Sequence, residues 1–202
     1  MITLHHLNQS RSQRIVWLLE ELGTPYELVH HQRDPITRLA PPSLHQVHPL
    51  GKAPILSDST LTLCESAAII EYLLDTDDNN ALRPEKGTHA YYSYLQWMHF
   101  AEGSLALPLI TNMLMGMEDR DGKQPMDGYV KKELNLDLAF IEMTLSKQAY
   151  FAGEHFSAAD IMMTFLLNIA ANAMLLEQHP HTRAYLTKVQ QRPAYAKAQQ
   201  QG

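Results

Sequence analysis

Hydrophobic and polar residues alternate at the start of the chain and then change to a helical spacing. Ile2 and Leu4 alternate with polar neighbours, which predicts a short strand. From Asn8 to Leu22 the apolar residues instead recur every three or four positions, which predicts a helix that follows a polar turn. The first backbone N–H groups of such a helix have no partners within it, and a helix start of this kind attracts anions.

The following segments continue an α/β pattern. Strands are predicted at Tyr26–Val29, Ile55–Leu56 and Thr60–Leu63, and a helix is predicted at Ala67–Leu74. The proline-containing stretch Asp34–His48 is expected to be irregular, with at most one short helix. The order β-α-β followed by β-β-α predicts a compact α/β domain.

The rest of the chain has helical spacing and no strand pattern. Helices are predicted at His89–Met117, Tyr129–Ser146, Ile161–Ala173 and His181–Gln190. Pro108 is expected to kink or interrupt the first of these helices rather than to end it. The second part of the chain is therefore predicted to be all-helical.

A polar stretch separates the two patterns. It contains consecutive aspartate and asparagine residues and is typical of a linker. The predicted organisation is an α/β domain at residues 1–76, a linker at residues 77–87 and an all-α domain at residues 88–202.

Composition excludes several classes of protein. The 202 residues are 45% hydrophobic, which is ample for a packed core, and the net charge of −6 argues against a general nucleic-acid binder. No apolar run reaches the roughly eighteen residues of a membrane span, and no signal peptide is recognisable, so we expect a cytoplasmic protein without a membrane segment. The single cysteine excludes an intramolecular disulfide.

Four short stretches carry residue types with chemical meaning. They are Ser10 with Arg14 at the first helix start, HPLGKAP at residues 48–54, ESAAI at residues 65–69, and FSAADI at residues 156–161. In this order and spacing they resemble the cytosolic glutathione S-transferases, and the resemblance covers essentially the whole chain. The amino-acid sequences of the first helix and of residues 97–109 look most like those of the bacterial and fungal members that use an active-site serine.

The resemblance implies a fold, an activity and an assembly. The fold is a thioredoxin-like N-terminal domain followed by an all-α domain that provides a pocket for hydrophobic substrates. The activity is detoxification, in which the thiolate of the co-substrate glutathione attacks a small hydrophobic electrophile. The assembly is a homodimer. Two alternatives stay open, namely glutathione-dependent reduction of disulfides or peroxides and a non-catalytic binding or regulatory role.

The resemblance also assigns a glutathione site. Pro54 takes the place of a cis-proline, which allows the backbone of Ala53 to bind an extended peptide. Ser66 and its helix start would hold the γ-glutamyl carboxylate, Glu65 the ammonium group and Lys52 the glycyl carboxylate. Without the resemblance, Ser66 would be interpreted as a plain helix cap, and Glu65 and Lys52 as solvated surface charges.

The thiol itself requires a hydrogen-bond donor. Lowering a thiol pKa of about 8.5 by about two units needs about 2.7 kcal/mol, whereas an exposed helix start supplies only about 0.3 to 1 kcal/mol. A hydroxyl bonded to a charged group adds about 1.5 to 3 kcal/mol. Ser10 is the expected donor because it lies four residues before Arg14, as in the serine-type members. Ser12 and Asn8 are the alternates.

The remaining candidates concern the second domain and metals. A hydrophobic substrate pocket is expected at Trp97, Phe100, Met113 and Met117, although a residue at helical spacing is more often part of the core. No metal site is expected, because adjacent histidines on a strand point to opposite faces.

In the FSAADI stretch, a serine three residues before an aspartate predicts a capping box. This cap is expected to contribute about 1 kcal/mol to stability and nothing to catalysis.

Overall fold

The structure is a computed structural model that describes residues 1–77 and 82–201. Contacts between residues divide it into two compact units, which are residues 1–77 with residues 190–201, and residues 82–189. Of the predicted linker at residues 77–87, residues 78–81 lie outside the described residues. The predicted domain boundaries stay a prediction, but the segment after residue 189 groups with the first unit rather than with the helical domain.

The first unit contains a four-stranded mixed sheet. Its strands are β1 (Ile2–Leu7), β2 (Tyr26–His31), β3 (Ile55–Ser57) and β4 (Thr62–Cys64), in the order β2-β1-β3-β4. β1 is parallel to β2 and antiparallel to β3, which is antiparallel to β4. The predicted strands therefore form one sheet, and its parallel pair is connected by a helix, as the β-α-β order requires.

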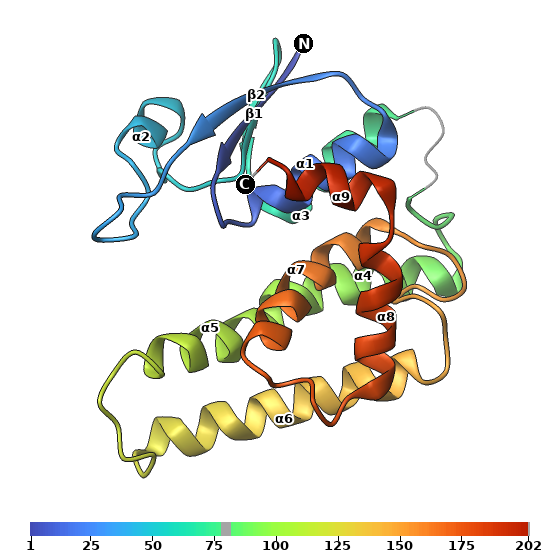
Figure 1. Cartoon of the computed structure of the whole chain (residues 1–202). Coiled ribbons are helices and arrows are strands. Elements are labelled where there is room, and N and C mark those ends of the chain that lie inside the picture. Colours follow the sequence, from blue (N-terminus) through green and yellow to red (C-terminus); the bar gives the residue numbers. More distant parts are fainter. Residues whose placement is uncertain (78–81, 202) are drawn as a thin grey trace. The chain divides into compact units, whose positions relative to one another are not determined.

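Four helices belong to this unit, namely α1 (Ser12–Leu22), α2 (Ser43–Val47), α3 (Ser66–Thr76) and α9 (Pro193–Gln199). Figure 1 shows α1, α3 and α9 side by side, and residues of α1 contact both of the other helices. The apolar stripe of α1 is buried, including Ile15, Leu18 and Leu19. On the other side of the sheet, Leu44 of α2 packs against Leu7 and Ile55.

The helix α9 is not predicted by the sequence pattern. It is short, so local propensity alone does not stabilise it. Its position on α1 is fixed by tertiary contacts: the rings of Trp17 and Tyr195 lie 4.9 Å apart, and Arg192 donates to both carboxylate oxygens of Glu21 at 2.6 and 2.7 Å. Pro193 at the first helical position was the available sequence signal.

The second unit is helical. Its helices are α4 (His89–Phe100), the π-helical turn η1 (Ala101–Leu105), α5 (Ala106–Met115), α6 (Pro125–Leu145), α7 (Ala158–Asn172) and α8 (Pro180–Gln190). In Figure 1, α5 and α6 run side by side, and the two helices are in contact. The fold prediction is confirmed: a thioredoxin-like unit is followed by an all-α unit.

The interruption predicted for the long helix lies one turn before Pro108. Pro108 has no N–H, so the carbonyl four residues earlier, that of Ser104, cannot receive the usual helical bond. The turn η1 is π-helical instead, and the N–H of Ala106 bonds the carbonyl of Ala101. The helix continues after it as α5, so Pro108 does not end the helix.

The core of the second unit surrounds α7. This helix is buried on nearly all sides, as its continuous apolar sequence predicts. At its start Asp160 accepts the backbone N–H and the hydroxyl of Ser157 at 2.8 and 3.0 Å, which confirms the predicted capping box. Within residues 1–77 and 82–201, no helix has both the length and the apolar character needed to cross a lipid bilayer.

Candidate active site

One edge of the sheet in the first unit gathers the predicted polar residues. His5 pairs with Ile55, which pairs in turn with Cys64. Because β1 and β4 end at this edge and β3 begins there, the segments that follow or precede them meet on the same side of the sheet. These segments are residues 8–12, residues 52–54 and residues 65–66. The topology therefore brings together Ser10, Ser12, Asn8, Lys52, Ala53, Pro54, Glu65 and Ser66.

The two serines at the start of α1 have different environments. Ser12 is fully buried, and its hydroxyl lies 2.9 Å from Nδ1 of His6, accepts the backbone N–H of Leu7 at 3.1 Å and lies 3.3 Å from the Leu7 carbonyl oxygen. Ser10 Oγ lies 2.7 Å from Ser12 Oγ and accepts the Ser12 backbone N–H at 3.2 Å. The Ser10 hydroxyl has fewer hydrogen-bond partners than the Ser12 hydroxyl, so it can still form a hydrogen bond with a ligand.

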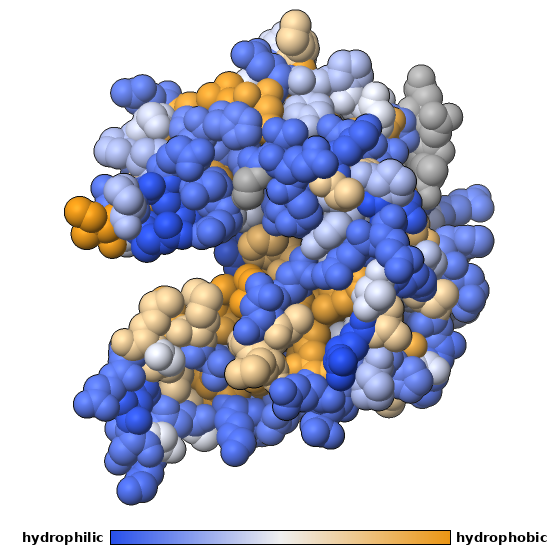
Figure 2. Space-filling model, in the orientation of Figure 1, coloured by the Kyte–Doolittle hydropathy of each residue, from blue (hydrophilic) through white to orange (hydrophobic). Residues whose placement is uncertain are grey.

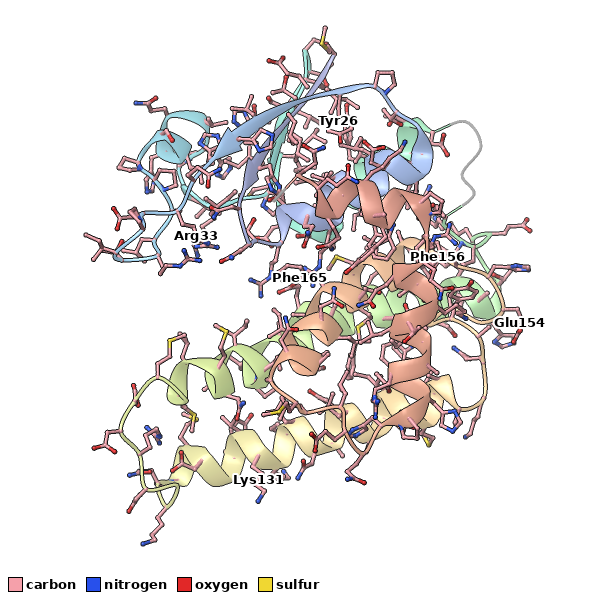
Figure 3. The ribbon with its side chains drawn as sticks, viewed as in Figure 1. Tyr26, Arg33, Lys131, Glu154, Phe156 and Phe165 are labelled. Atoms are coloured by element: carbon pink, nitrogen blue, oxygen red, sulfur yellow. The ribbon has the colours of Figure 1, made fainter. Side chains whose placement is uncertain are left out.

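The third candidate donor, Asn8, is held by Arg33. The Arg33 backbone N–H donates to Asn8 Oδ1 at 2.8 Å, while its guanidinium donates to the carbonyls of Asn8 at 3.1 Å, Gln9 at 3.3 Å and Arg38 at 2.9 Å. Figure 3 shows Arg33 just beyond the end of β2. Because Oδ1 of Asn8 is already an acceptor for Arg33, the orientation of the amide is fixed, and its NH2 group has no partner in the described part of the chain.

Arg33 also contributes charge to this turn. Burial and the neighbouring charge of Arg38 lower the pKa of Arg33 from its usual value, but a guanidinium stays protonated at neutral pH. Its side-chain partners are carbonyl oxygens, so no carboxylate among residues 1–77 and 82–201 cancels its charge. An anion near residues 8–10 is therefore favoured by Arg33 as well as by the α1 helix start.

Replacing Arg33 with alanine is expected to lower kcat/KM several-fold for the glutathione reaction that the resemblance implies. The turn that carries Ser10 would lose the guanidinium bonds to Asn8 and Gln9, and small displacements of a reacting group reduce the rate strongly. Steady-state kinetics of Arg33→Ala and Arg33→Lys test this, because lysine keeps the charge but not the forked set of donors. Arg183→Ala, at an exposed arginine of the second unit, is the control and should retain the activity of the unchanged protein. A fully active Arg33→Ala protein would contradict the role of Arg33 in holding the turn.

The start of α3 has an unusual backbone and an unpartnered hydroxyl. Glu65 is exposed and has φ 74° and ψ 119°, a left-handed conformation that costs a non-glycine residue about 1 to 3 kcal/mol. Ser66 is only 5% exposed, and its Oγ has no hydrogen-bond partner among the described residues. The Ser66 hydroxyl does not cap the helix, because the N-cap is Glu65 and no side chain caps it. The hydroxyl and the free N–H groups of α3 together form a site for a carboxylate.

The segment before β3 has the predicted geometry at proline. The peptide bond between Ala53 and Pro54 is cis, and Ala53 precedes the residues that pair β3 with β1. Gly51 adopts φ 57°, a conformation that favours glycine, and a Cβ atom there would lie 2.4 Å from the His45 ring, so any other residue would be strained. This turn leaves Lys52 exposed, where its ammonium group is accessible to an anion.

The four residues predicted to form a substrate pocket have two kinds of environment in the second unit. Trp97 is 2% exposed and packs in an aromatic cluster with Phe100, Phe140 and Phe151, with ring centroids 4.9, 5.1 and 4.6 Å away. Trp97 is thus buried among aromatic side chains, and its assignment to the substrate pocket stays a prediction. Met113 and Met117 are 41% and 74% exposed. Figure 2 shows hydrophobic surface over α5.

The neighbouring histidines of β1 and β2 form pairs on opposite faces of the sheet. Nδ1 of His5 lies 3.0 Å from Nε2 of His31, while the ring of His6 lies 5.7 Å from that of His30. Within residues 1–77 and 82–201, no group of three or more histidine, cysteine or acidic side chains is arranged to hold a metal ion.

Sequence reasoning missed two residues that contact the candidate donors, namely Arg33 and His6. Arg33 is 25 residues away from Asn8 in sequence, and only the parallel pairing of β1 with β2 brings it near. For His6, the alternation of β1 was a usable signal, because it places His6 on the same face as the buried Leu4. A histidine on a buried face needs a polar partner, and Ser12 is that partner.

Comparisons with known proteins agree with this geometry. The sequence model of the glutathione S-transferase N-terminal domain matches residues 1–75, and that of the C-terminal domain matches residues 105–193. A curated relative, glutathione S-transferase 3 of Schizosaccharomyces pombe, is 39% identical over 96% of this chain and 85% of its own length. The chain belongs to the glutathione S-transferase family, as a glutathione transferase enzyme.

Solved structures show the same fold. The crystal structure of a glutathione S-transferase from Actinobacillus pleuropneumoniae is 36% identical, with a TM-score of 0.90 over 99% of this chain and 92% of that chain. A glutathione transferase family member from Pseudomonas fluorescens, solved with two glutathione molecules bound, is 25% identical, with a TM-score of 0.80 over 98% of this chain and 91% of that chain. The fold is therefore shared along essentially the whole chain.

Proposed function

We propose that this enzyme belongs to the serine-type members and conjugates glutathione to hydrophobic electrophiles. In the proposed reaction, the Ser10 hydroxyl at the start of α1 stabilises the glutathione thiolate, which attacks the electrophile and displaces its leaving group or adds to it. The observation that carries the proposal is the buried hydroxyl of Ser66, which is unpartnered among the described residues and lies beside free helix N–H groups. A buried hydroxyl without a protein partner is suited to a ligand.

The tripeptide can be assigned to the sheet edge group by group. The γ-glutamyl carboxylate would accept from Ser66 Oγ and from the N–H groups of α3, while its ammonium group would lie against Glu65. The cysteinyl backbone would pair with Ala53, as an added strand pairs with a sheet edge. Lys52 would hold the glycyl carboxylate. These assignments leave the start of α1 for the sulfur, because β1, which α1 follows, ends next to the beginning of β3.

Hydrogen bonding favours Ser10 over the two alternates as the donor to sulfur. Ser12 is fully buried and lies against His6 and both backbone groups of Leu7, so its hydroxyl belongs to the protein interior. Asn8 has a free amide NH2, but the Arg33 N–H fixes the orientation of that amide, whereas the Ser10 hydroxyl can rotate toward a ligand. A hydroxyl bonded to a thiolate contributes about 1.5 to 3 kcal/mol, which exceeds the contribution of an exposed helix start.

The electrophile is proposed to be apolar. Exposed hydrophobic side chains gather on and just after α5, where Leu107, Met113, Leu114 and Met117 are between 41% and 74% exposed. Flexible methionines adapt to apolar molecules of different shape. With Phe100 they form the proposed hydrophobic site, and Trp97 supports it from the core. We also propose that the enzyme is a cytoplasmic homodimer, as is typical of the family, which sedimentation of the purified protein would test.

The activity is tested by parallel assays of the purified enzyme with glutathione. A chlorinated nitroaromatic substrate reports conjugation, whereas a mixed disulfide of glutathione and an organic hydroperoxide report the two reductions. Conjugation is expected to have the highest kcat/KM of the three. Binding of glutathione without turnover of any substrate would support a non-catalytic role and contradict the proposal.

Reduction of disulfides is the second candidate function. The observation that favours it is the Pseudomonas fluorescens relative with two glutathione molecules bound, because a disulfide of glutathione has two such halves. In that reaction the thiolate held by Ser10 attacks a disulfide sulfur, and the other sulfur leaves as a thiolate. No protein cysteine is needed, which fits a chain whose single cysteine is Cys64 in β4.

Replacing Ser66 with alanine is expected to raise the KM for glutathione by about 10-fold, because a hydrogen bond to a charged carboxylate is lost. The kcat at saturating glutathione should change little, since Ser66 is remote from the sulfur in the proposed arrangement. Initial rates over a range of glutathione concentrations measure both quantities. Ser59→Ala, at an exposed turn of the same unit, is the control and should leave KM unchanged. An unchanged KM in Ser66→Ala would contradict the carboxylate assignment.

A further inference from the structure

The segment at residues 34–39, which follows β2, folds into a compact turn of its own. Asp34 Oδ1 accepts the backbone N–H groups of Ile36 and Thr37 at 3.0 and 2.7 Å and the Thr37 hydroxyl at 3.0 Å. The Arg38 N–H donates to the Asp34 carbonyl at 2.9 Å, which closes the turn. The backbone that carries the Arg38 side chain therefore has a defined shape without a ligand.

Two arginines fasten this 34–39 turn to the turn at residues 8–10. The guanidinium of Arg33 donates to the carbonyls of Gln9 at 3.3 Å and Arg38 at 2.9 Å, and the guanidinium of Arg38 donates to Oε1 of Gln9. Gln9 and Arg38 both adopt a left-handed backbone conformation, with φ 52° and 60°, which costs a non-glycine residue about 1 to 3 kcal/mol. Arg33, labelled in Figure 3, thus joins two strained positions and restricts where the Arg38 guanidinium lies.

The two arginines are cations without a counterion. Arg38 is exposed, and its guanidinium, which has five N–H donors, bonds the neutral amide of Gln9. In the part of the chain that the structure describes, neither Arg33 nor Arg38 forms an ion pair with a carboxylate. Burial and the charge of Arg38 lower the pKa of Arg33, so the charge that acts on Arg33 is of the same sign. Two like charges held close together favour the binding of an anion.

Apolar side chains flank the Arg38 cation. Ile36 and Leu39 are 89% and 67% exposed and belong to the same short turn. Their apolar surface is therefore accessible to a ligand next to a charged group. An organic carboxylic acid combines an apolar body with one anionic group, and a guanidinium matches a carboxylate with two parallel N–H donors.

The Arg38 site lies beside the proposed position of the glutathione sulfur. Gln9, whose side chain Arg38 bonds, directly precedes Ser10 along the chain. The proposed function already assigns the γ-glutamyl carboxylate of glutathione to Ser66 and the glycyl carboxylate to Lys52. The carboxylate that remains for Arg38 is one that the second substrate carries.

We propose that Arg38 binds a carboxylate of the electrophile, so that the preferred electrophiles of this enzyme are apolar carboxylic acids. The proposal rests on the proposed function, because Ser10 marks the position of the sulfur. Arg38 touches the substrate, whereas Arg33 is a positioning residue that acts through Gln9 and Arg38. With a chlorinated acid, the thiolate forms the C–S bond as the C–Cl bond breaks and chloride leaves, while the carboxylate stays bound and unchanged.

The test compares two electrophiles of similar size, the anion 4-chloro-3-nitrobenzoate and the neutral 4-chloro-3-nitrobenzamide. Each kcat/KM is divided by the rate constant of the uncatalysed reaction with glutathione, which removes the difference in intrinsic reactivity. In the unaltered enzyme the resulting value is expected to be about 10-fold higher for the benzoate. In Arg38→Gln, which removes the charge but keeps an amide donor for Gln9, the preference should fall to about two-fold or less.

Two further variants control for charge and for general effects of substitution. Arg38→Lys keeps the charge without the forked donors and should retain part of the preference. Arg183→Gln, at an exposed arginine of the second unit, should retain all of it. Conjugation of the benzamide without a preference for the benzoate, or a preference unchanged in Arg38→Gln, would overturn the proposal and leave the proposed function standing. If neither compound is conjugated, the proposed function fails, and the proposal fails with it.

A second comparison distinguishes the carboxylate of the electrophile from the glycyl carboxylate of glutathione. The KM for glutathione, and for glutathione esterified at its glycyl carboxylate, is measured in Arg38→Gln and in Lys52→Gln. Arg38→Gln is expected to leave both KM values unchanged, whereas Lys52→Gln should raise the KM for glutathione and not for the ester. If Arg38→Gln instead raises the KM for glutathione and not for the ester, Arg38 binds the glycyl carboxylate, which would overturn the proposal.

Discussion

Replacing Asp160 with alanine is expected to lower the free energy of unfolding by at least about 3 kcal/mol. Its carboxylate is fully buried and accepts from the backbone N–H groups of Phe151 and Ser157 at 3.0 and 2.8 Å, from the Ser157 hydroxyl at 3.0 Å and from Tyr185 Oη at 2.8 Å. Each buried donor left without an acceptor costs about 1 to 3 kcal/mol. Urea unfolding, followed by circular dichroism, measures the change.

Two variants control for the loss of side-chain volume at Asp160. Asp160→Asn keeps one acceptor oxygen and should be destabilised less than Asp160→Ala. Ser157→Ala removes one hydroxyl but keeps its backbone N–H bonded, so a cost of about 1 kcal/mol is expected. Equal destabilisation by Ser157→Ala and Asp160→Ala would show that the bonds to Phe151 and Tyr185 contribute nothing.

Replacing Ser10 with alanine is expected to lower kcat/KM for conjugation about 10- to 100-fold at neutral pH. A hydroxyl bonded to a thiolate contributes about 1.5 to 3 kcal/mol, and about 1.4 kcal/mol corresponds to a factor of ten. The KM for glutathione should change little, because the carboxylate and backbone contacts remain. Initial rates with a chlorinated nitroaromatic substrate over a range of pH values measure the effect.

The pH dependence distinguishes loss of the donor from loss of structure. In Ser10→Ala the rate should approach that of the unaltered enzyme as the pH rises above the raised thiol pKa, because the thiolate then forms without help. A constant deficit at every pH would indicate a structural defect instead. Ser43→Ala is a suitable control, because Ser43 lies at the start of α2 and its hydroxyl contacts His31.

The fold follows from the sequence where one face of an element is buried. Alternation in β1 and the apolar stripe of α1 predict both elements, because a one-residue shift would expose the residues that the core requires. The helix α9 lacks such a pattern, and its contacts with Trp17 and Glu21 come from a segment far away in sequence. Local patterns cannot predict a helix that is stabilised by distant contacts.

The sequence proposes residues for the candidate site but not the contacts between them. The resemblance to the family assigns Ser10, Ala53 and Ser66 to a glutathione site. The β1-β3-β4 pairing places all three residues at one edge of the sheet. No spacing of residues in the sequence predicts the positive φ of Glu65 or the hydrogen bond between His6 and Ser12. Both depend on tertiary positions that a single sequence does not contain.

The environments of two further residues have a common cause. The helical spacing of Trp97 does not show what surrounds its ring, because its aromatic neighbours Phe140 and Phe151 come from later segments. The capping box at Asp160 was predicted to contribute about 1 kcal/mol, whereas Tyr185 and Phe151 add two further donors. In both cases the sequence indicates the residue, and segments far along the chain determine its environment.

In the proposed mechanism, the Ser10 hydroxyl stabilises the thiolate of bound glutathione. The most direct test of this role is a pH titration of thiolate absorbance with glutathione bound, in the unaltered enzyme and in Ser10→Ala. The unaltered enzyme is expected to show a thiol pKa about one to two units below that of Ser10→Ala. Identical thiol pKa values in two proteins that both bind glutathione would contradict this mechanism.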